Sequence, residues 1–333
     1  MKRICIVIVY FGNWPKWFEF FLQSCRYNPS INWIFYTDCI IPEKHPKNVK
    51  FIKGNLKNLN QLISEKLGIL SGIKDSYKVC DFRPAFGIIF GEYLTDYNFW
   101  GYGDIDLIYG DIGKFITEED LNKYDIISTK KGFTAGHFML LKNSKEVNNF
   151  YKKTLNYRNV FERRDWVGFD EGSWSIVRAQ PNDEFFIKNK NIQSFTHAVK
   201  FYGKKGLIRA RFKDVIFEDS ELKGNWEVIW YKGKLIERTN GIEVMYLHFL
   251  NSKKDKDFKV QKFKKFPLSF SITPRGIFEE KNPYMIHIYY RRLKFRLLQK
   301  IDFGIGEFGL LLKKHSPELY FKLKQIISKM RMR

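Results

Sequence analysis

The chain has 333 residues, of which 44% are hydrophobic and 17% aromatic, and it carries a formal net charge of +22. This length and apolar content can bury the core of one large or two smaller domains, which excludes a mostly disordered protein. No apolar run reaches about eighteen residues, so we expect no membrane-spanning helix. The charge is compatible with a lysine-rich surface, an anionic membrane, nucleic acid or a phosphate-bearing substrate, and by itself does not choose among them.

The cysteines show neither Cys-x-x-Cys spacing nor a Cys/His cluster with zinc spacing. We therefore expect free, buried thiols in a reducing cytoplasm. The short apolar run after Lys2 and Arg3 is rich in β-branched residues and no small-x-small cleavage site follows, so we expect a first strand rather than a signal peptide. The four cysteines are Cys5, Cys25, Cys39 and Cys80.

Residues 4–10 are continuously apolar, which is typical of a strand buried on both faces of a parallel sheet. Residues 14–27 have apolar side chains at helical spacing, and Pro15 suits the first turn of that helix. Farther along we expect strands at 32–37, 49–52, 98–102, 125–128 and 137–141, and helices at 58–67, 82–94 (capped by Asp81) and 144–155. This alternation up to about residue 155 predicts an α/β fold with a mostly parallel sheet flanked by helices.

After residue 155 the pattern is mixed. A hairpin is predicted at 226–231 and 234–237, followed by a strand at 244–249 and a charged loop at 253–265. The chain is helical in pattern and basic from Met285 onward, and residues 284–333 hold seven Lys and five Arg against three acidic residues. We therefore divide the chain into a main domain, 1–265, and a basic helical extension, 266–333. That extension could lie on an anionic membrane or pack as a solvated helix.

The most informative feature is a glycine-flanked Asp-x-Asp, formed by Asp104 and Asp106. Carboxylates one residue apart point to opposite faces of a regular strand, so they can act together only where a strand bends into a loop. Gly101 and Gly103 allow such a bend. Carboxylates at a strand end suit a hard divalent cation that carries phosphate oxygens, although turn and capping carboxylates are the alternative. Asp111 is a further candidate, which capping of the next segment explains equally well.

The order of these parts resembles the GT-A glycosyltransferases over about residues 1–260. Within that group it is most similar to uncharacterised bacterial enzymes of capsular and surface polysaccharide synthesis that carry a Trp-Gly-x-x-Asp-Ile-Asp motif. The resemblance implies a GT-A-like, Rossmann-like catalytic domain that transfers a hexose from a nucleotide-diphosphate sugar with the help of Mn²⁺ or Mg²⁺. The residues that carry it are Tyr10-Phe11-Gly12, Asp38, Cys80-Asp81-Phe82-Arg83-Pro84, Trp100-Gly101-Tyr102-Gly103-Asp104-Ile105-Asp106 and Met245-Tyr246-Leu247-His248-Phe249.

The same resemblance implies roles for the residues around the metal. Asp106 would bind the cation directly, and Asp104 would contact the ribose or the metal. His248 would be a third ligand, although a lone histidine at a strand end is often structural. Lys253, shortly after it, would contact the diphosphate.

The other expected donor-binding residues lie near the carboxyl ends of the first strands, where open α/β sheets bind ligands. Tyr10, Phe11 and Gly12 follow the first strand directly. Asp38 would face the base or ribose, or would cap a turn. Arg83 would contact a phosphate through charge-assisted bonds, or would pair with a surface acid.

The acceptor side is expected beyond the Asp-x-Asp motif. The resemblance places Gly136 and His137 there, and Trp166 offers a face on which a sugar can stack. An inverting enzyme also needs a base that deprotonates the acceptor hydroxyl, for which Asp170 is the first choice and Glu171 the second. The alternative for His137 is a structural histidine, and the alternative for Asp170 and Glu171 is a solvated acidic turn.

We therefore expect a cytoplasmic, metal-dependent glycosyltransferase, peripheral on the inner face of the plasma membrane if the tail binds lipid. Its acceptor would be a hydroxyl of a surface glycan or a lipid-linked oligosaccharide. Two other classes stay open: a metal-dependent nucleotidyl- or phosphotransferase that uses the same carboxylates, and a non-enzymatic nucleic-acid-binding protein, motivated by the charge of +22. The aromatic residues are spread through the predicted core rather than along a base-stacking platform, so we expect no nucleic acid partner.

Overall fold

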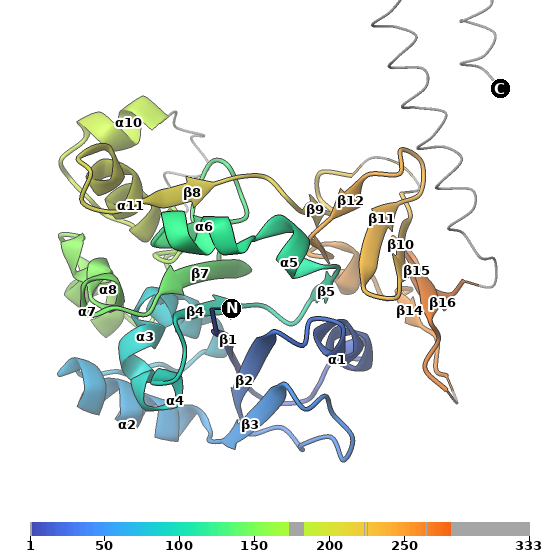
Figure 1. Cartoon of the computed structure of the whole chain (residues 1–333). Helices are drawn as coiled ribbons and strands as arrows, with labels where there is room; N and C mark the ends of the chain where they lie inside the picture. Colours follow the sequence, from blue (N-terminus) through green and yellow to red (C-terminus); the bar gives the residue numbers. More distant parts are fainter. Residues whose placement is uncertain (1, 173–182, 223, 225, 264, 281–333) are drawn as a thin grey trace, which may run out of the picture.

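The structure, a computed structural model, describes residues 2–172, 183–222, 224, 226–263 and 265–280. Within these residues a seven-stranded sheet has the order β3-β2-β1-β4-β7-β6-β8 and forms the centre of the molecule (Figure 1). Its strands are β1 (Ile4–Tyr10), β2 (Ile31–Thr37), β3 (Val49–Lys53), β4 (Phe99–Gly103), β6 (Ile126–Ser128), β7 (Phe138–Lys142) and β8 (Ala210–Phe212).

The pairing in this sheet is mostly parallel. Strands β1, β2, β3 and β4 pair in parallel, as do β6 and β8, whereas β7 runs antiparallel to both of its neighbours. Alternate residues of β1 enter opposite cores: Ile6 packs on one face of the sheet and Cys5 and Val7 on the other. A strand covered on both faces has no solvent-exposed side, which explains why residues 4–10 are continuously apolar. The α/β class and the mostly parallel sheet expected from the sequence are confirmed.

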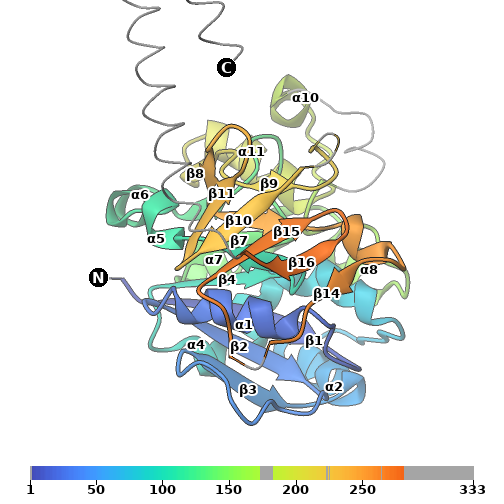
Figure 2. The ribbon, with the colours of Figure 1, turned by 90° about the vertical axis from the view of Figure 1, so that its right-hand side faces the viewer.

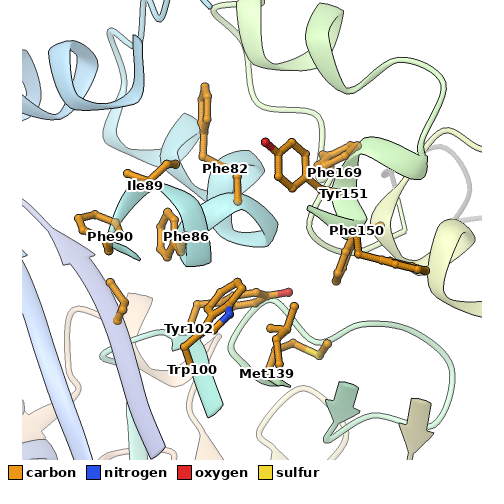
Figure 3. Packing of buried hydrophobic residues seen from close by; sticks show 14 of the residues in the cluster. Phe82, Phe86, Ile89, Phe90, Trp100, Tyr102, Met139, Phe150, Tyr151 and Phe169 are labelled. Carbon is orange, nitrogen blue, oxygen red and sulfur yellow. The ribbon is translucent and has the colours of Figure 1, made fainter. Parts of the chain in front are cut away.

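Helices cover both faces of the sheet. One face packs against α2 (Leu56–Leu67), η1 (Ser76–Ala85), α3 (Phe86–Ile89), α4 (Gly91–Leu94), α7 (Lys145–Asn148), η2 (Phe150–Lys153), α8 (Tyr157–Glu162) and α11 (Phe195–Lys204). Figure 3 shows this core, in which Phe86 faces Trp100 and Tyr102 of β4, whereas Phe82 stacks on Phe161. Burial of each such ring stabilises the fold by about 1.5–3 kcal/mol.

The opposite face carries α1 (Phe18–Arg26), α5 (Ile112–Phe115) and α6 (Glu118–Lys123), and α10 (Asp183–Lys188) lies beside α11. A small sheet with the order β5-β13-β9 also packs there, with the strands β5 (Leu107–Tyr109), β9 (Phe217–Glu218) and β13 (Tyr246–His248). Because β5 follows β4 after only three residues, the chain passes from the central sheet to the small one at Asp104–Asp106.

A third sheet has the order β12-β11-β10-β15-β16-β14 and lies beside α1 (Figure 2). The hairpin predicted near residue 232 is confirmed, since β10 and β11 pair across Lys232 and Gly233, both at positive φ. Its members are β10 (Val228–Tyr231), β11 (Lys234–Glu237), β12 (Glu243–Val244), β14 (Lys259–Val260), β15 (Ser269–Thr273) and β16 (Gly276–Glu279), with the short helix η3 (Ser252–Lys254) before β14.

Several predicted elements were wrong in extent. The helix expected at 82–94 begins as a 3₁₀ helix at Ser76, capped by Asp75. Asp81 is not a cap: it lies fully buried and pairs with Lys78, a tertiary role that a local pattern cannot show. The helix expected at 144–155 is divided into α7 and η2, and α1 begins at Phe18 rather than at residue 14.

Residues 269–279, which we expected at the start of a helical extension, form β15 and β16. Their alternate residues Phe270 and Ile272 enter the core of the third sheet, which is why they are extended. The basic stretch from Met285 lies outside the described residues, so the helical tail, its contact with a membrane and the division of the chain stay predictions. All four cysteines are free thiols, as expected. Within the described ranges, every helix is too short or too polar to cross a bilayer.

Candidate active site at the junction of two sheets

The Asp-x-Asp motif lies where the chain leaves the central sheet. The last residue of β4, Gly103, pairs with Phe138 of β7, and the next amide, of Asp104, donates to the carbonyl of His137 at 3.1 Å. One residue farther on, the indole of Trp17 donates to the carbonyl of Ile105 at 2.9 Å. These two hydrogen bonds fix the backbone of the motif where β4 ends and the chain bends. Such a bend is what allows Asp104 and Asp106 to act together.

Gly101 shows why β4 needs glycine. A Cβ at this position would lie 2.1 Å from the carbonyl oxygen of Met139 on β7. The two strands can approach to hydrogen-bonding distance only because that carbon is absent.

His248 joins the motif through the small sheet. Strand β13 pairs antiparallel with β5, so that His248 lies opposite Leu107, and Phe249 donates its amide to the carbonyl of Asp106 at 3.2 Å. The Nε2 atom of His248 lies 3.2 Å from Oδ2 of Asp106. Asp104, Asp106 and His248 together offer ligand atoms within 4.8 Å of one another. Two carboxylates and an imidazole suit Mn²⁺, and the carboxylates suit Mg²⁺, so the residues present fit the expected cation.

Two cationic side chains face these carboxylates. Arg83 pairs with Asp104, and Lys253 pairs with Asp106. Burial alone would raise the pKa of Asp106, but His248 and Lys253 outweigh it and hold that pKa well below its usual range. Burial lowers the pKa of His248, and the charge of Asp106 more than reverses this and raises it. The carboxylate of Asp106 is therefore ionised, which is the form that binds a cation.

A cleft of about 380 Å³ opens above the motif. Six residues expected at the site line it together: Tyr10, Phe11, Arg83, Asp104, Asp106 and Lys253. Tyr77, Trp17 and Leu250 also line it and were missed as site residues, because Trp17 reads as part of an apolar helix face and the others lie in no motif. Aromatic rings and cations thus surround a carboxylate pair, an arrangement that suits a base and phosphates.

Gly12 and Asp38 lie beside the cleft but are outside its described lining. The amide of Gly12, which has φ of +98°, donates to Oδ1 of Asp38 at 2.7 Å. This bond closes the loop that carries Phe11. It supports the turn-cap alternative for Asp38, and a contact with the base or ribose stays a prediction.

Asp170 and Glu171 lie behind Arg83. Arg83 bridges the two groups of acids, because one guanidinium nitrogen meets Asp104 and the other lies 3.0 Å from Oδ2 of Asp170. Glu171 accepts the amide of Gly136 at 3.0 Å. A Cβ on Gly136 would lie 2.8 Å from Asp170 Oδ2 and 2.9 Å from Glu171 Oε1, so this position needs a small residue.

Asp170 is buried and Glu171 is half-buried, so the two acids do not form a solvated turn. Burial raises the pKa of Asp170 well above its usual range, although Arg83 opposes this, and burial also raises the pKa of Glu171. A carboxyl with a raised pKa binds a proton more readily, which suits a proton acceptor. Neither acid is in the described lining of the cleft, so their catalytic role stays a prediction.

The other two expected acceptor residues have structural partners. His137 is only 4% exposed, and burial lowers its pKa well below the usual range, so the ring is neutral. Its Nδ1 lies 2.7 Å from the hydroxyl of Tyr246. Trp166 packs edge-on against Tyr77 of the cleft wall, with 4.7 Å between ring centroids. Their contact with an acceptor stays a prediction.

Comparison with known proteins places the chain in a family. Residues 6–281 match DUF6625, described as a family of unknown function, and the chain belongs to it. No curated protein sequence matches the chain.

Two solved structures resemble it at low identity. The galactosyltransferase LgtC, solved with donor and acceptor sugar analogues, is 10% identical over 74% of this chain and 87% of its own, with a TM-score of 0.36. Mouse xyloside xylosyltransferase 1, in its apo form, is 10% identical over 76% of this chain and 99% of its own, with a TM-score of 0.35.

Proposed function

For this member of DUF6625, we propose a metal-dependent glycosyltransferase that moves a hexose from a nucleotide-diphosphate sugar to a hydroxyl group. The observation that carries the proposal is that Asp104 and Asp106 line a cleft of about 380 Å³ and that the buried His248 offers a third ligand atom within 4.8 Å of theirs. Lys253 and Arg83 lie at the same place. A cation site, additional cations and aromatic walls around one cleft suit a donor that carries a diphosphate and a nucleoside.

Each group has a chemical task in this reaction. Asp104, Asp106 and His248 would hold Mn²⁺ or Mg²⁺, and the ion would supply positive charge that neutralises a diphosphate leaving group. Lys253 and Arg83 now balance the carboxylates, and with a cation on those carboxylates they are free to bind phosphate oxygens. The rings of Tyr10 and Phe11 line the cleft and would bind the nucleoside.

The acceptor side uses the acids behind Arg83. We assign Asp170, and after it Glu171, to take the proton of the attacking hydroxyl. Because Arg83 contacts both Asp104 and Asp170, the proposed proton acceptor lies one side chain away from the donor carboxylates. The acceptor would be a surface glycan or a lipid-linked oligosaccharide, and a lipid-linked acceptor would place the enzyme on the inner face of the plasma membrane.

A metal-dependent nucleotidyl- or phosphotransferase is the second candidate, because the same carboxylates would serve it. The released product separates the two: a sugar transfer releases nucleoside diphosphate, whereas a nucleotidyl transfer releases pyrophosphate. A binding protein for nucleic acid would instead show tight, salt-sensitive oligonucleotide binding without turnover.

The test begins with a thermal-shift panel of nucleotide sugars with Mn²⁺, since a ligand that binds the folded state raises its stability. Turnover of the stabilising donor is then measured for the wild type, Asp106→Asn and Asp111→Asn. Asp111 caps α5 through its side chain and lies outside the metal cluster, so its variant is the matched control. We expect Asp106→Asn to lower metal-dependent turnover at least about a hundredfold, which corresponds to roughly 2.7 kcal/mol in the barrier. Near-normal turnover of a folded Asp106→Asn protein would remove the metal site from the proposal.

A further inference from the structure

A second set of metal-ligating side chains lies next to the Asp104–Asp106 motif. Parallel pairing of β9 with β13 places Glu218 beside His248, and His137 directly precedes β7. His137, Glu218 and His248 offer ligand atoms within 4.8 Å of one another. The two imidazole rings lie 4.7 Å apart between centroids. The sequence showed no signal for Glu218, which reaches His248 only through the sheet.

The hydrogen bonds around His137 leave its Nε2 atom unprotonated, with a lone pair that can bind a metal. The hydroxyl of Thr129 donates to the carbonyl of Phe138 at 3.3 Å, and the Tyr246 hydroxyl, 2.6 Å away, then donates to Thr129. The Nδ1–H of His137 completes the chain by donating to Tyr246. Its Nε2 is therefore an acceptor, buried and without a hydrogen-bond partner among the described residues. If Tyr246 instead donated to His137 Nδ1, the proton of His137 would lie on Nε2. That buried N–H would be unpaired, which costs about 1–3 kcal/mol.

His248 presents a similar nitrogen. Its Nε2 faces Asp106, while its Nδ1 is buried and has no hydrogen-bond partner in the described part of the chain. Oε1 of Glu218 lies 3.9 Å from Nδ1, which is too far for a hydrogen bond. In a tetrahedral Zn²⁺ site, two ligand atoms that each lie about 2.0–2.2 Å from the metal are roughly 3.3–3.6 Å apart. Glu218 would therefore move towards His248 by only a few tenths of an ångström to share a cation with it.

We propose that His137 Nε2, His248 Nδ1 and the Glu218 carboxylate form a second cation site of the zinc class, which competes with the Asp104–Asp106 site for His248. Two imidazoles and one carboxylate are a known ligand set for Zn²⁺ with one open position. Nitrogen-rich sites also favour Zn²⁺ over Mn²⁺ and Mg²⁺.

Competition follows from the chemistry of one ring. A neutral imidazole has one lone-pair nitrogen and one N–H, so His248 can serve either site but not both. When Nδ1 binds the second cation, Nε2–H donates to Asp106. Bound Zn²⁺ therefore withdraws His248 from the first site.

A neighbouring cation does not block the second site. Lys130 lies 3.4 Å from Oε2 of Glu218, but it also pairs with Glu221 at 2.5 Å. Lys130 thus keeps a carboxylate partner when Glu218 turns towards a cation. Glu221 is 59% exposed at its side chain and lies outside the cluster.

The test measures Zn²⁺ binding rather than activity, so its result does not depend on the proposed transferase reaction. Full-length Asp106→Asn protein is dialysed against Zn²⁺ and its bound metal is counted by mass spectrometry, with the visible spectrum of bound Co²⁺ as a second readout. We expect one Zn²⁺ per chain and the intense bands of tetrahedral Co²⁺. Adding Glu218→Gln should weaken Zn²⁺ binding at least about tenfold. Loss of a residue that only hydrogen-bonds to a metal ligand already weakens metal binding by about that factor, and Glu218 would be a direct ligand. Adding Asp111→Asn instead should leave it unchanged, because Asp111 caps α5 and lies outside both ligand clusters.

Competition is tested in the wild type. Excess Mn²⁺ should weaken Zn²⁺ binding to His248 in the wild type and should have no effect in Asp106→Asn. Absence of Zn²⁺ from the Asp106→Asn protein, or equal binding with and without Glu218→Gln, would overturn the second site. Zn²⁺ and Mn²⁺ binding together without mutual weakening would overturn the competition. Circular dichroism checks the fold, and His137→Gln replaces Glu218→Gln if that variant does not fold.

Discussion

Replacement of Lys78 by Met should destabilise the protein strongly, because it leaves the carboxylate of Asp81 buried without its cation. Both side chains are fully buried, and Lys78 Nζ lies 2.8 Å from Oδ2 of Asp81. The same ammonium donates to the carbonyl of Val160 at 2.6 Å. Asp81 also accepts the backbone amides of Val167 at 3.0 Å and Phe169 at 2.8 Å. The pair therefore ties η1 to the segment that leads into Asp170.

The expected loss follows from these contacts. Removal of one partner of a buried ion pair costs about 3–5 kcal/mol. The carbonyl of Val160 also loses its donor, so we expect the upper part of that range. Because a whole domain is stable by only about 5–15 kcal/mol, this one change should remove a third or more of the total.

Urea unfolding, followed by circular dichroism, measures the effect as a lower midpoint with an unchanged slope. The double variant Lys78→Met, Asp81→Leu should lose much less than the sum of the single losses, since no buried charge remains. Lys66→Met is the control, because its pair with Glu92 lies at the surface and should contribute little. A loss in unfolding free energy below about 1 kcal/mol in Lys78→Met would show that this variant does not leave an uncompensated buried charge on Asp81.

The remaining predictions concern the site, the sheet and the tail. Asp170→Asn should lower sugar transfer by about 10²–10⁴-fold, as expected for a lost general base, while calorimetry shows donor affinity retained; loss of donor binding would instead make Asp170 a donor contact. Gly101→Ala should cost at least about 2 kcal/mol in urea unfolding, because the added carbon overlaps a carbonyl on β7. Gly132→Ala, with nothing within 4 Å of its added carbon, should be near neutral, and equal losses would contradict the packing argument. Truncation after Pro283 should reduce sedimentation with anionic liposomes while donor hydrolysis continues; unchanged sedimentation would remove the membrane role of the tail.

Much of the central sheet could be predicted from local pattern. A strand buried on both faces is apolar along its length, so residues 4–10 and 33–36 can be recognised as strands without any knowledge of their neighbours. The bend itself is where the sequence predicted it, at residues 104–106 between β4 and β5. Gly101 and Gly103, however, lie within β4 without positive φ, and Gly101 is needed for the close approach of β4 and β7 rather than for the bend.

Local pattern failed where a residue's partner is distant. Asp81 has the spacing of a helix cap, yet it is the buried partner of Lys78 and of two amides more than eighty residues away. Residues 269–279 follow a charged loop, yet pairing with β10 makes them strands. In both places the energy of a tertiary contact exceeds a local preference of a few tenths of a kcal/mol to about 1 kcal/mol.

The sequence by itself therefore determined the α/β class, the central strands and the Asp-x-Asp motif with its bend. Only the tertiary structure decided that the motif spans two sheets, and that this crossing places Asp106 3.2 Å from His248, 142 residues away in the chain. It also decided that Glu218 lies beside His248, through the pairing of β9 with β13. Strand pairing fixes such distances through backbone hydrogen bonds, which nearly every residue can form. The pattern of side chains along one strand therefore does not predict which other strand pairs with it.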